Sequence, residues 1–471
     1  MNLVWFRNDL RLRDNPALWH SCQDGVTGGI FILTPEQWRN HGMAAVRIDF
    51  LLRNLRVLSR RLHEIGIPLI IEQAGRFADV PEILHRNCQQ LGVEGLYWND
   101  EYPLDEQRRD QSVQDSMAGA GIDCHRFHDR TIAPPGSVLK KDGEPYQVFT
   151  PFKRTWQTLL DLGPPELFPA PLAQSVPELP RGVSTEIPGA IEGFDSPVPA
   201  SLWPAGEEEA QKKLDDFCRN RIGHYERDRD FPGVEGTSTL SPYLAIGALS
   251  PQQCLRAALE ARSRGSSAQQ GADSWINELV WRDFYQHLVV AYTHLCKGQP
   301  FKAETAELRW RNSEEDFERW CRGETGVPIV DAGMRQLLRT GWMHNRVRMI
   351  TAMFLTKNLL IDWRRGEHWF MTHLVDGDFA ANNGGWQWSA STGTDAAPYF
   401  RIFNPFTQAE RFDPEARYIK HFVPELKDLE PRQIHRPDAL GKSRPAGYPD
   451  LMVDLKKSRQ AAIDAFKDLQ R

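Results

Sequence analysis

The chain of 471 residues carries a net charge of −6, and 41% of its residues are hydrophobic, which is ordinary for a globular protein. The length predicts two or three domains rather than a single core. Because the net charge is negative, no overall positive field attracts nucleic acid, and any such binding must use a local basic surface.

The cysteines and the amino-terminal segment indicate the cellular compartment. The seven cysteines are scattered and none forms a CxxC pair, so reduced thiols are favoured over a disulfide framework. The first residues lack the pattern of a signal peptide, and no apolar stretch approaches the roughly 18 residues of a membrane span. We therefore expect a cytoplasmic protein that works as a monomer.

The first 130 residues alternate short apolar runs with helical patterns. This alternation predicts an α/β domain with a doubly wound, Rossmann-like parallel sheet. The expected strands cover residues 3–7, 30–33, 68–72, 95–98 and 124–127, and the expected helices cover 43–65, 79–91 and 104–120. No GxGxxG motif is present, so an ordinary dinucleotide site is not expected, but a ligand would lie beyond the carboxyl ends of the strands.

The rest of the chain changes character twice. Ten of the 32 prolines fall within residues 161–206, where regular structure is not expected. We interpret residues 131–206 as an interdomain connector and residues 207–471 as a larger, all-α domain. The expected helices of this domain cover residues 207–218, 251–261, 274–292, 314–322, 330–340 and 345–360.

Several familiar chemistries have no motif in this sequence. It has no HExxH or Cys/His zinc spacing, no GxxxxGK[ST] phosphate loop and no GxSxG nucleophile elbow. The segment with Asp376 and Asp378 begins like a calcium loop, but Gln387 stands where the bidentate Glu should be. We therefore expect no metal site.

Three segments are candidates for function. Residues 376–388 hold two Asp, two Asn and two Trp, which favours a functional site over a capped loop between helices. The GTSTLS segment at 236–241 offers hydroxyls and backbone N–H groups to a phosphate, although simple N-capping explains it equally well. Residues 334–365 hold seven Lys or Arg and one acid beside aromatic side chains, as in sites for single strands or extruded bases, although charge alone fits a solvated face.

The expected helix at 274–292 brings four candidate side chains onto one face. Trp275, Glu278, Trp281 and Arg282 follow one another at helical spacing. Glu278 and Arg282 have the order of a favourable surface ion pair, but two tryptophans on the same face argue against plain solvent exposure.

Five sequence blocks together resemble the photolyase/cryptochrome family. They are WFRNDLRLRDNPAL near the start, GTSTLSPYLAIGALSP, WINELVWRDFY, TGWMHNRVRM and DGDFAANNGGWQWSASTGTDAAPYFRIFNP. The sequence is most similar to bacterial (class I) photolyases that split cyclobutane pyrimidine dimers and carry a folate antenna. The resemblance implies an antenna-binding α/β domain at 1–130 and a helical domain at 207–471 that binds FAD and DNA.

The resemblance also implies a reaction. In this family, excited and fully reduced flavin, FADH⁻, donates an electron to a dimer that has flipped out of the duplex. The cyclobutane bonds break and the electron returns, so the enzyme is a carbon–carbon lyase and the chemistry belongs to the cofactor. DNA is the expected partner, and no obligate protein partner is implied.

The family's flavin-binding positions carry over residue by residue. The positions matched to the pyrophosphate and ribityl region are Tyr225, Thr237, Ser238, Thr239, Leu240 and Ser241. The positions matched to the rest of the flavin site are Trp275, Glu278, Arg282, Asn345, Arg348, Asp376, Asp378 and Asn382. Asn382 is expected to face flavin N5, where plant cryptochromes have Asp, and Arg348 near the ring would favour the reduced anion.

The expected DNA contacts also follow from matched positions. Trp281 and Trp388 would form the aromatic walls of the dimer pocket, where stacking contributes roughly 1–3 kcal/mol per base. Glu278 would hydrogen-bond the pyrimidine edge. Asn345 and Met349 would complete the pocket. The residues matched to phosphate contacts beside the lesion are Arg229, Arg346 and Arg401.

Two further sets of residues match electron supply and light harvesting. Trp386, Trp363 and Trp310 match the tryptophan chain that carries electrons to the flavin. The positions matched to an antenna, 5,10-methenyltetrahydrofolate, are His41, Asp105, Glu106, Cys296 and Lys297. The relatives have Asn at position 105, and Asp lacks the donors of the amide, so deazaflavin stays the alternative antenna.

Three other functions stay open. A (6-4) photolyase would use a His-rich pocket, whereas Met343 and Asn345 surround His344 here and favour cyclobutane dimers. A cryptochrome-type light sensor would keep the flavin but lose repair, and it often carries a long C-terminal extension. A dark flavin oxidoreductase would need an open site for a hydride donor, and no nicotinamide fingerprint is visible.

Overall fold

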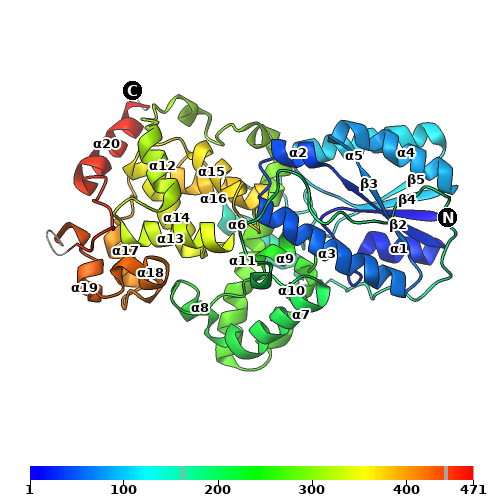
Figure 1. Ribbon diagram of the computed structural model, residues 1–471, viewed down its shortest axis with the longest axis horizontal. Helices are drawn as coiled ribbons and strands as arrows, with labels where there is room; N and C mark the ends of the chain where they lie inside the picture. Colours follow the sequence, from blue (N-terminus) through cyan, green and yellow to red (C-terminus); the bar gives the residue numbers. More distant parts are fainter. Residues whose placement is uncertain (161–162, 164, 440–443, 470–471) are drawn as a thin grey trace. The chain divides into compact units, whose positions relative to one another are not determined.

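The computed structural model describes residues 1–160, 163, 165–439 and 444–469 (Figure 1). The chain divides into two compact units. The first comprises Met1–Gly223, Ser238–Thr293 and Val375–Ala380, and the second comprises His224–Thr237, His294–Leu374 and Ala381–Arg471. The expected domain boundaries at residues 130 and 206 both fall within the first unit, and they remain predictions.

A five-stranded parallel sheet forms the centre of the α/β part of the first unit. The strands are β1 (Asn2–Phe6), β2 (Thr27–Leu33), β3 (Leu69–Gln73), β4 (Gly95–Asn99) and β5 (Asp123–Phe127), in the order β3-β2-β1-β4-β5. The helices between them are α1 (Pro16–Asp24), α2 (Pro35–Asn40), α3 (Ala45–Glu64), α4 (Val80–Leu91) and α5 (Leu104–Ala120). Helices α1 and α3 cover one face of the sheet, and α4 and α5 cover the other (Figure 1). This arrangement confirms the predicted doubly wound fold.

Local signals explain why these elements begin and end where they do. The Asn15 side chain accepts a hydrogen bond from the Leu18 N–H and caps α1. Gly66, with φ 79°, follows the end of α3 in a conformation that favours glycine. Ser250 and Gln253 form a reciprocal capping box at the start of α10 (Pro251–Arg262).

The first unit continues with further helices after β5. They are α6 (Phe149–Leu160), α7 (Glu207–Asp216), α9 (Ser241–Ala245), α10 and α11 (Ser266–Ala291), with a π-helical turn, η3 (Phe217–Arg221), and a 3-10 turn, η4 (Ile222–His224), after α7. In the described part of 161–206, the one regular element is a 3-10 turn at Ala200–Leu202, as expected.

One helix of this unit was missed, and the expected start of another was wrong. Helix α6 was not expected inside the connector, although Phe149, Phe152 and Trp156 recur at helical spacing and are buried. Helix α11 begins at Ser266 rather than at 274, because its polar first turns carry little apolar periodicity.

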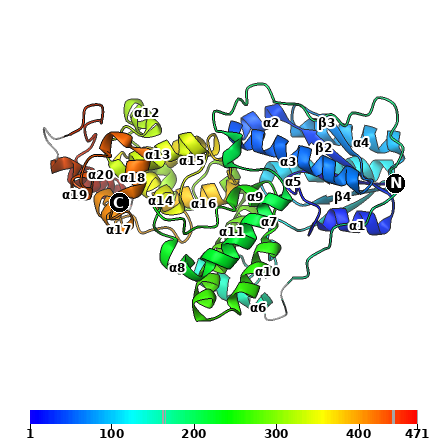
Figure 2. The same cartoon turned by 60° about the horizontal axis from the view of Figure 1, so that its bottom comes forward.

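The second unit is helical in its described residues (Figure 2). Its helices are α8 (Tyr225–Asp228), α12 (Glu314–Arg322), α13 (Pro328–Thr340), α14 (Asn345–Met353), α15 (Trp363–Met371), α17 (Pro405–Phe412), α18 (Arg417–Phe422), α19 (Pro431–Ile434) and α20 (Leu455–Asp468), together with most of α16 (Phe379–Ala390). The shorter turns are η5 (Thr293–Lys297), η6 (Ala303–Glu307), η7 (Phe354–Asn358), η8 (Pro424–Leu426) and η9 (Pro437–Ala439). The helix expected at 345–360 is therefore α14 followed by the π-helical turn η7.

The core of the second unit is rich in tryptophan. Trp320, Trp363 and Trp386 are buried together with aliphatic side chains of α13, α14 and η7. No described helix is both long enough and apolar enough to cross a membrane. All seven cysteines are free thiols.

Candidate functional site

Helix α11 carries two of the expected tryptophans, Trp275 and Trp281, and both pack against aromatic side chains of the first unit. The Trp281 ring stacks on Phe149 of α6, with ring centroids 3.6 Å apart and planes 4° apart. Trp275 is buried and packs against Phe217 at 4.9 Å. One face of the Trp281 indole is therefore covered and its orientation is fixed before any ligand arrives. Phe149 was missed because helix α6 was missed.

Asp378 is held by two side chains that were not expected from the sequence, Arg130 and Gln286. The Arg130 guanidinium forms an ion pair with the Asp378 carboxylate at 3.2 Å, and the Gln286 amide donates to both carboxylate oxygens at 3.1 Å. Arg47 donates to the backbone oxygen of Gly377. Arg130 follows β5, so the rule that ligands lie beyond the carboxyl ends of parallel strands was the available signal.

Arg282 and Asp376 lie in the same unit. Arg282 donates to the backbone oxygen of Arg130, and burial lowers the pKa of its guanidinium. Asp376 is buried. Arg282 therefore contacts the backbone that follows β5 inside the first unit.

The GTSTLS segment starts a short helix without the expected capping. Leu240 occupies the N-cap of α9, and among the described residues its side chain makes no capping hydrogen bond. The Thr239 hydroxyl donates to the backbone oxygen of Ser238 at 2.8 Å, and Thr239 has a φ of 51°. Simple N-capping therefore does not account for the hydroxyl-rich sequence.

Asn382 is oriented by one hydrogen bond in the second unit. Its side-chain nitrogen donates to the backbone oxygen of Glu367 at 2.9 Å. Because this contact requires a donor, the amide cannot be turned over, and the Asn382 Oδ1 atom is fixed as an acceptor. Among the described residues no group donates to Oδ1.

The neighbouring Asn383 binds the Glu367 side chain. The Asn383 amide nitrogen donates to the Glu367 carboxyl at 2.8 Å, and burial raises the pKa of Glu367 to about 7. Glu367 could not be identified from the sequence, because a single acid within GEHWF gives no sign that two asparagines of another helix contact it.

The three tryptophans expected to carry electrons belong to one core. Trp386 and Trp363 are 2% and 1% exposed, and Trp310 is partly buried against the same cluster. Trp386 also lies against Phe370 at 4.9 Å and Trp320 at 6.0 Å between ring centroids. Trp320 was not among the expected residues, because it lies outside the matched positions.

The basic residues around α14 are partly neutralised inside the second unit. The Arg346 guanidinium forms an ion pair with Asp230 at 2.7 Å and lies over the Phe412 ring at 4.5 Å. Arg348 donates from Nε to the Met343 backbone oxygen at 2.8 Å. Arg229 lies over the ring of Tyr225, which is buried, at 5.4 Å. Asp230 was missed as the partner that holds Arg346.

The remaining expected pocket and phosphate residues differ in exposure. Asn345 and Arg401 are exposed, whereas Met349 and Trp388 are partly buried. Phe400, beside Arg401, is 58% exposed, which is unusual for a large aromatic side chain and was not noted from the sequence.

Three of the expected antenna residues meet in the first unit. His41 lies 3.3 Å from the Asp105 carboxylate and 3.6 Å from the Glu106 carboxylate. Burial raises the pKa of Glu106, and its Oε2 atom is buried without a hydrogen-bond partner among the described residues. Cys296 and Lys297 lie on η5 in the second unit.

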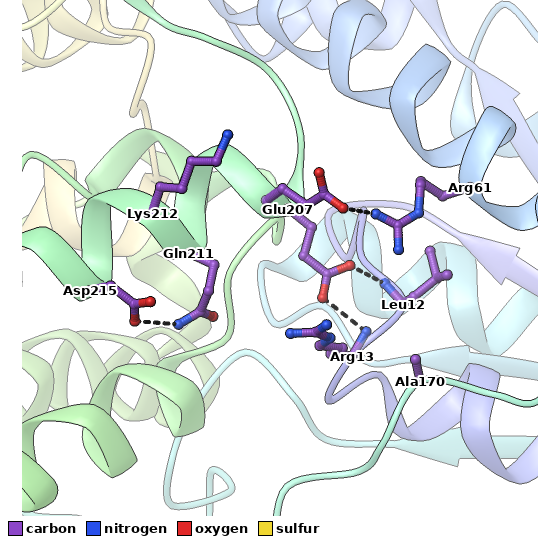
Figure 3. Close-up of a pocket in the computed structure, with 9 residues that line it drawn as sticks. Leu12, Arg13, Arg61, Ala170, Glu207, Gln211, Lys212 and Asp215 are labelled. Atoms are coloured by element: carbon purple, nitrogen blue, oxygen red, sulfur yellow. Dashed lines mark hydrogen bonds and ion pairs between the residues drawn. The ribbon is translucent and has the colours of Figure 1, made fainter.

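A separate hollow of about 280 Å³ in the first unit is lined by charged residues (Figure 3). Glu207 accepts hydrogen bonds from the Leu12 and Arg13 N–H groups at 2.9 and 3.1 Å, and Arg61 forms an ion pair with Glu208. The charged groups thus fasten the start of α7 to the α/β part. None of the expected site residues lines this hollow, and we assign it a structural role.

The geometry of the described residues offers no metal centre. Within them, no group of three or more His, Cys, Asp or Glu side chains could hold a metal ion.

Comparisons with known proteins agree with these features. Residues 2–173 match the family model described as DNA photolyase, and residues 275–468 match the model described as FAD binding domain of DNA photolyase. The chain is 44% identical to a deoxyribodipyrimidine photo-lyase of Vibrio cholerae, over 99% of both chains. It is also 44% identical to the enzyme of that name from Escherichia coli, over 99% of this chain and 98% of the other.

A solved structure supports the fold over the whole length. The crystal structure of a bacterial class III photolyase from Agrobacterium tumefaciens is similar with a TM-score of 0.88 at 35% identity. The alignment covers 99% of this chain and 97% of that one.

Proposed function

Because the chain belongs to the DNA photolyase family, we propose that it repairs cyclobutane pyrimidine dimers in DNA in a light-dependent reaction that uses bound FAD. The observation that carries this proposal is the match of both units' sequences, over almost the entire length, to enzymes named deoxyribodipyrimidine photo-lyase. The proposed reaction breaks the carbon–carbon bonds of the cyclobutane ring, so the enzyme is a carbon–carbon lyase.

The residues present fit FAD on two structural observations. The chain turns sharply at Thr239, with a φ of 51°, within a run of hydroxyl side chains before α9, and hydroxyl groups donate to phosphate oxygens. Asn382 presents a fixed acceptor, Oδ1, that suits the N–H group at N5 of a reduced flavin. When bound and fully reduced, FAD supplies the light-excited electron for repair.

The proposed flavin ligands are the residues at the positions matched to the family. Those proposed for the pyrophosphate and ribityl region are Tyr225, Thr237, Ser238, Thr239, Leu240 and Ser241. Those proposed for the rest of the flavin are Trp275, Glu278, Arg282, Asn345, Arg348, Asp376, Asp378 and Asn382. Arg348 would add positive charge near the ring and so favour its reduced, anionic form.

We assign the flipped dimer to a pocket with Trp281 and Trp388 as aromatic walls. Phe149 holds the Trp281 ring in place, so little side-chain freedom is lost when a base stacks on it. Glu278 would hydrogen-bond the pyrimidine edge, and Asn345 and Met349 would complete the pocket.

Binding of the DNA backbone requires exchange of ion-pair partners. Arg346 is paired with Asp230, so a phosphate beside the lesion must replace this carboxylate. The exchange keeps the guanidinium paired in both states, which lowers the cost of desolvation. Arg229 and Arg401 are the other proposed phosphate contacts. The exposed Phe400 beside Arg401 would fill the space that the flipped bases leave in the duplex.

We further propose that Trp386, Trp363 and Trp310 supply electrons to the flavin. Their shared position in one core of the second unit supports the proposal.

For the antenna we favour 5,10-methenyltetrahydrofolate over deazaflavin. The Oε2 atom of Glu106, which is buried and has no hydrogen-bond partner among the described residues, suits an N–H donor of a pterin, and Cys296 and Lys297 are the other proposed ligands. Asp105 weakens this assignment, because it lacks the amide donors. The absorption spectrum of the purified protein would distinguish the two antennas. We also propose that the enzyme is a monomer and that it is cytoplasmic, and its seven free thiols support the second of these proposals.

The experiment that tests the function is photorepair. Purified, reduced protein is mixed with an oligonucleotide that holds one thymine dimer, and restored thymines are measured in illuminated and dark samples. We expect repair in light alone. Bound flavin without repair of this lesion would contradict the proposal, and the same assay on a (6-4) photoproduct would then separate a (6-4) photolyase from a light sensor.

A further inference from the structure

Glu367 is a partly buried carboxyl to which the proposed repair reaction gives no role. It lies on α15 next to Gly366, at a point where α15 and α16 are in direct contact through the Trp386 ring. Burial raises the pKa of Glu367 to about 7, so both protonation states are accessible near neutral pH.

A chain of buried amides fixes the carboxyl in place. Asn383 donates to Glu367 Oε1 at 2.8 Å, Gln387 donates to Asn383 Oδ1 at 2.9 Å, and the Phe301 N–H donates to Gln387 Oε1 at 2.8 Å. The backbone oxygen of Glu367 orients Asn382. Among the described residues, neither Asn382 Oδ1 nor the second carboxyl oxygen, Oε2, receives a hydrogen bond. Both side chains are partly exposed, so these two acceptors are open to solvent or to a bound ligand.

The charged groups close to Glu367 oppose each other. Arg364 and Asp362 act on it from the start of its own helix, the first lowering and the second raising its pKa. The side chain that reaches it from α16, Asn383, is neutral. None of these three groups holds Glu367 in a single protonation state. A change in the charge of a ligand bound nearby would therefore change the pKa of Glu367.

We propose that Glu367 is a positioning residue that couples the charge of the bound flavin to the uptake of one proton. The inference rests on the proposed function, which assigns Asn382 to flavin N5. A negative charge nearby disfavours a second one, so a reduced, anionic flavin makes Glu367 hold its proton more tightly. Linkage is reciprocal: the protonated carboxyl favours reduction, and the carboxylate opposes it.

The sign of the effect follows from this linkage. Reduction takes up an extra proton from solvent onto Glu367 at pH values between its pKa beside oxidised flavin and its higher pKa beside reduced flavin. In this window the reduction potential falls more steeply as the pH rises. The electrons come from the chemical reductant of the titration, and no bond to the flavin is formed.

The test is a redox titration of the flavin-loaded full chain from about pH 6 to about pH 9, followed by flavin absorbance. Glu367→Gln keeps an acceptor for Asn383 but cannot ionise, and Glu410→Gln, at an exposed position, is the control. We expect a bend in the plot of potential against pH for the wild type and for Glu410→Gln, and its loss in Glu367→Gln. The same bend in Glu367→Gln would overturn the inference.

Two further results keep the test decisive. If Glu367→Gln does not fold, Glu367→Asp replaces it, and a bend at an unchanged pH would also overturn the inference. The infrared spectrum of the wild type at neutral pH should contain a carboxylic-acid C=O band from Glu367. This band should be absent in Glu367→Gln and shifted in Glu367→Asp. A wild type that repairs dimers without the bend refutes this inference alone, whereas a wild type that binds no flavin refutes the proposed function as well.

Discussion

The ring of Trp386 packs directly against the backbone of Gly366, where a methyl group would overlap the indole. The same methyl group would lie 2.7 Å from a side-chain carbon of Leu355. Position 366 therefore accepts no side chain as long as Trp386 keeps its place, and the contact between α15 and α16 depends on this glycine.

We predict that Gly366→Ala destabilises the protein by about 1–3 kcal/mol, the usual cost of overpacking a well-filled core. Denaturant unfolding followed by tryptophan fluorescence would measure the loss. The matched control is Gly119→Ala in α5, where a Cβ meets no atom within 4 Å. Because alanine has the higher helix propensity, this control should gain up to about 1 kcal/mol. Equal stability of the two variants would contradict the overlap.

The sequence predicted the α/β part well, because its signals are local. The residues that start or end these helices, Asn15, Gly66 and Ser250, contact residues within one helical turn. The start or end of a helix can therefore be predicted from neighbouring residues in the sequence. Residues that match a family motif could likewise be placed on their helices.

Partners that are distant in sequence could not be predicted in the same way. Arg130 and Asp378 are 248 positions apart, and their ion pair depends on how folded segments pack. Glu367 is 16 positions from Asn383, on a different helix, and its raised pKa comes from burial, which no single residue encodes. Helix α6 was missed because the proline-rich stretch after it dominated the interpretation of the connector.

Asn382→Asp should destabilise the reduced flavin. The replacement removes the donor to the Glu367 backbone oxygen and places a carboxylate there, at a cost of about 1–3 kcal/mol for the unmade hydrogen bond. The added negative charge also opposes an anionic flavin. We expect a shorter lifetime of the reduced flavin in air and slower repair. Asn40→Asp, at an exposed position in α2, is the control. An unchanged lifetime and repair rate in Asn382→Asp would count against its assignment to N5.

Trp310→Phe should slow photoreduction severalfold and leave repair by chemically reduced enzyme intact. Phenylalanine fills much of the same space but is far harder to oxidise, so it interrupts the proposed electron path without opening a large cavity. Trp369→Phe is the matched control, because Trp369 is also partly buried against the same core but lies outside the proposed chain. Loss of both photoreduction and repair in Trp310→Phe would show that Trp310 is structural.

His344 should make the second unit sensitive to mild acid. Its Nδ1 atom accepts a hydrogen bond from the Arg346 N–H and caps α14, which requires an unprotonated Nδ1. Burial, with Arg346, Arg348 and Arg229 nearby, lowers the pKa of His344 to about 4, although Asp230 acts in the opposite direction. Because the folded pKa lies below the ordinary value of 6.5, the stabilisation is complete above pH 6.5 and is lost as the pH falls toward 4.

The expected loss between about pH 7 and about pH 5 is about 2 kcal/mol in the free energy of unfolding. Denaturant titrations at the two pH values would measure it. His344→Asn keeps a good N-cap residue but does not titrate, so its stability should lack this part of the pH dependence while it stays folded at both values. Other groups titrate in both proteins, and the difference between the two curves isolates His344. Curves that run parallel would show that His344 does not cap α14 in its neutral form.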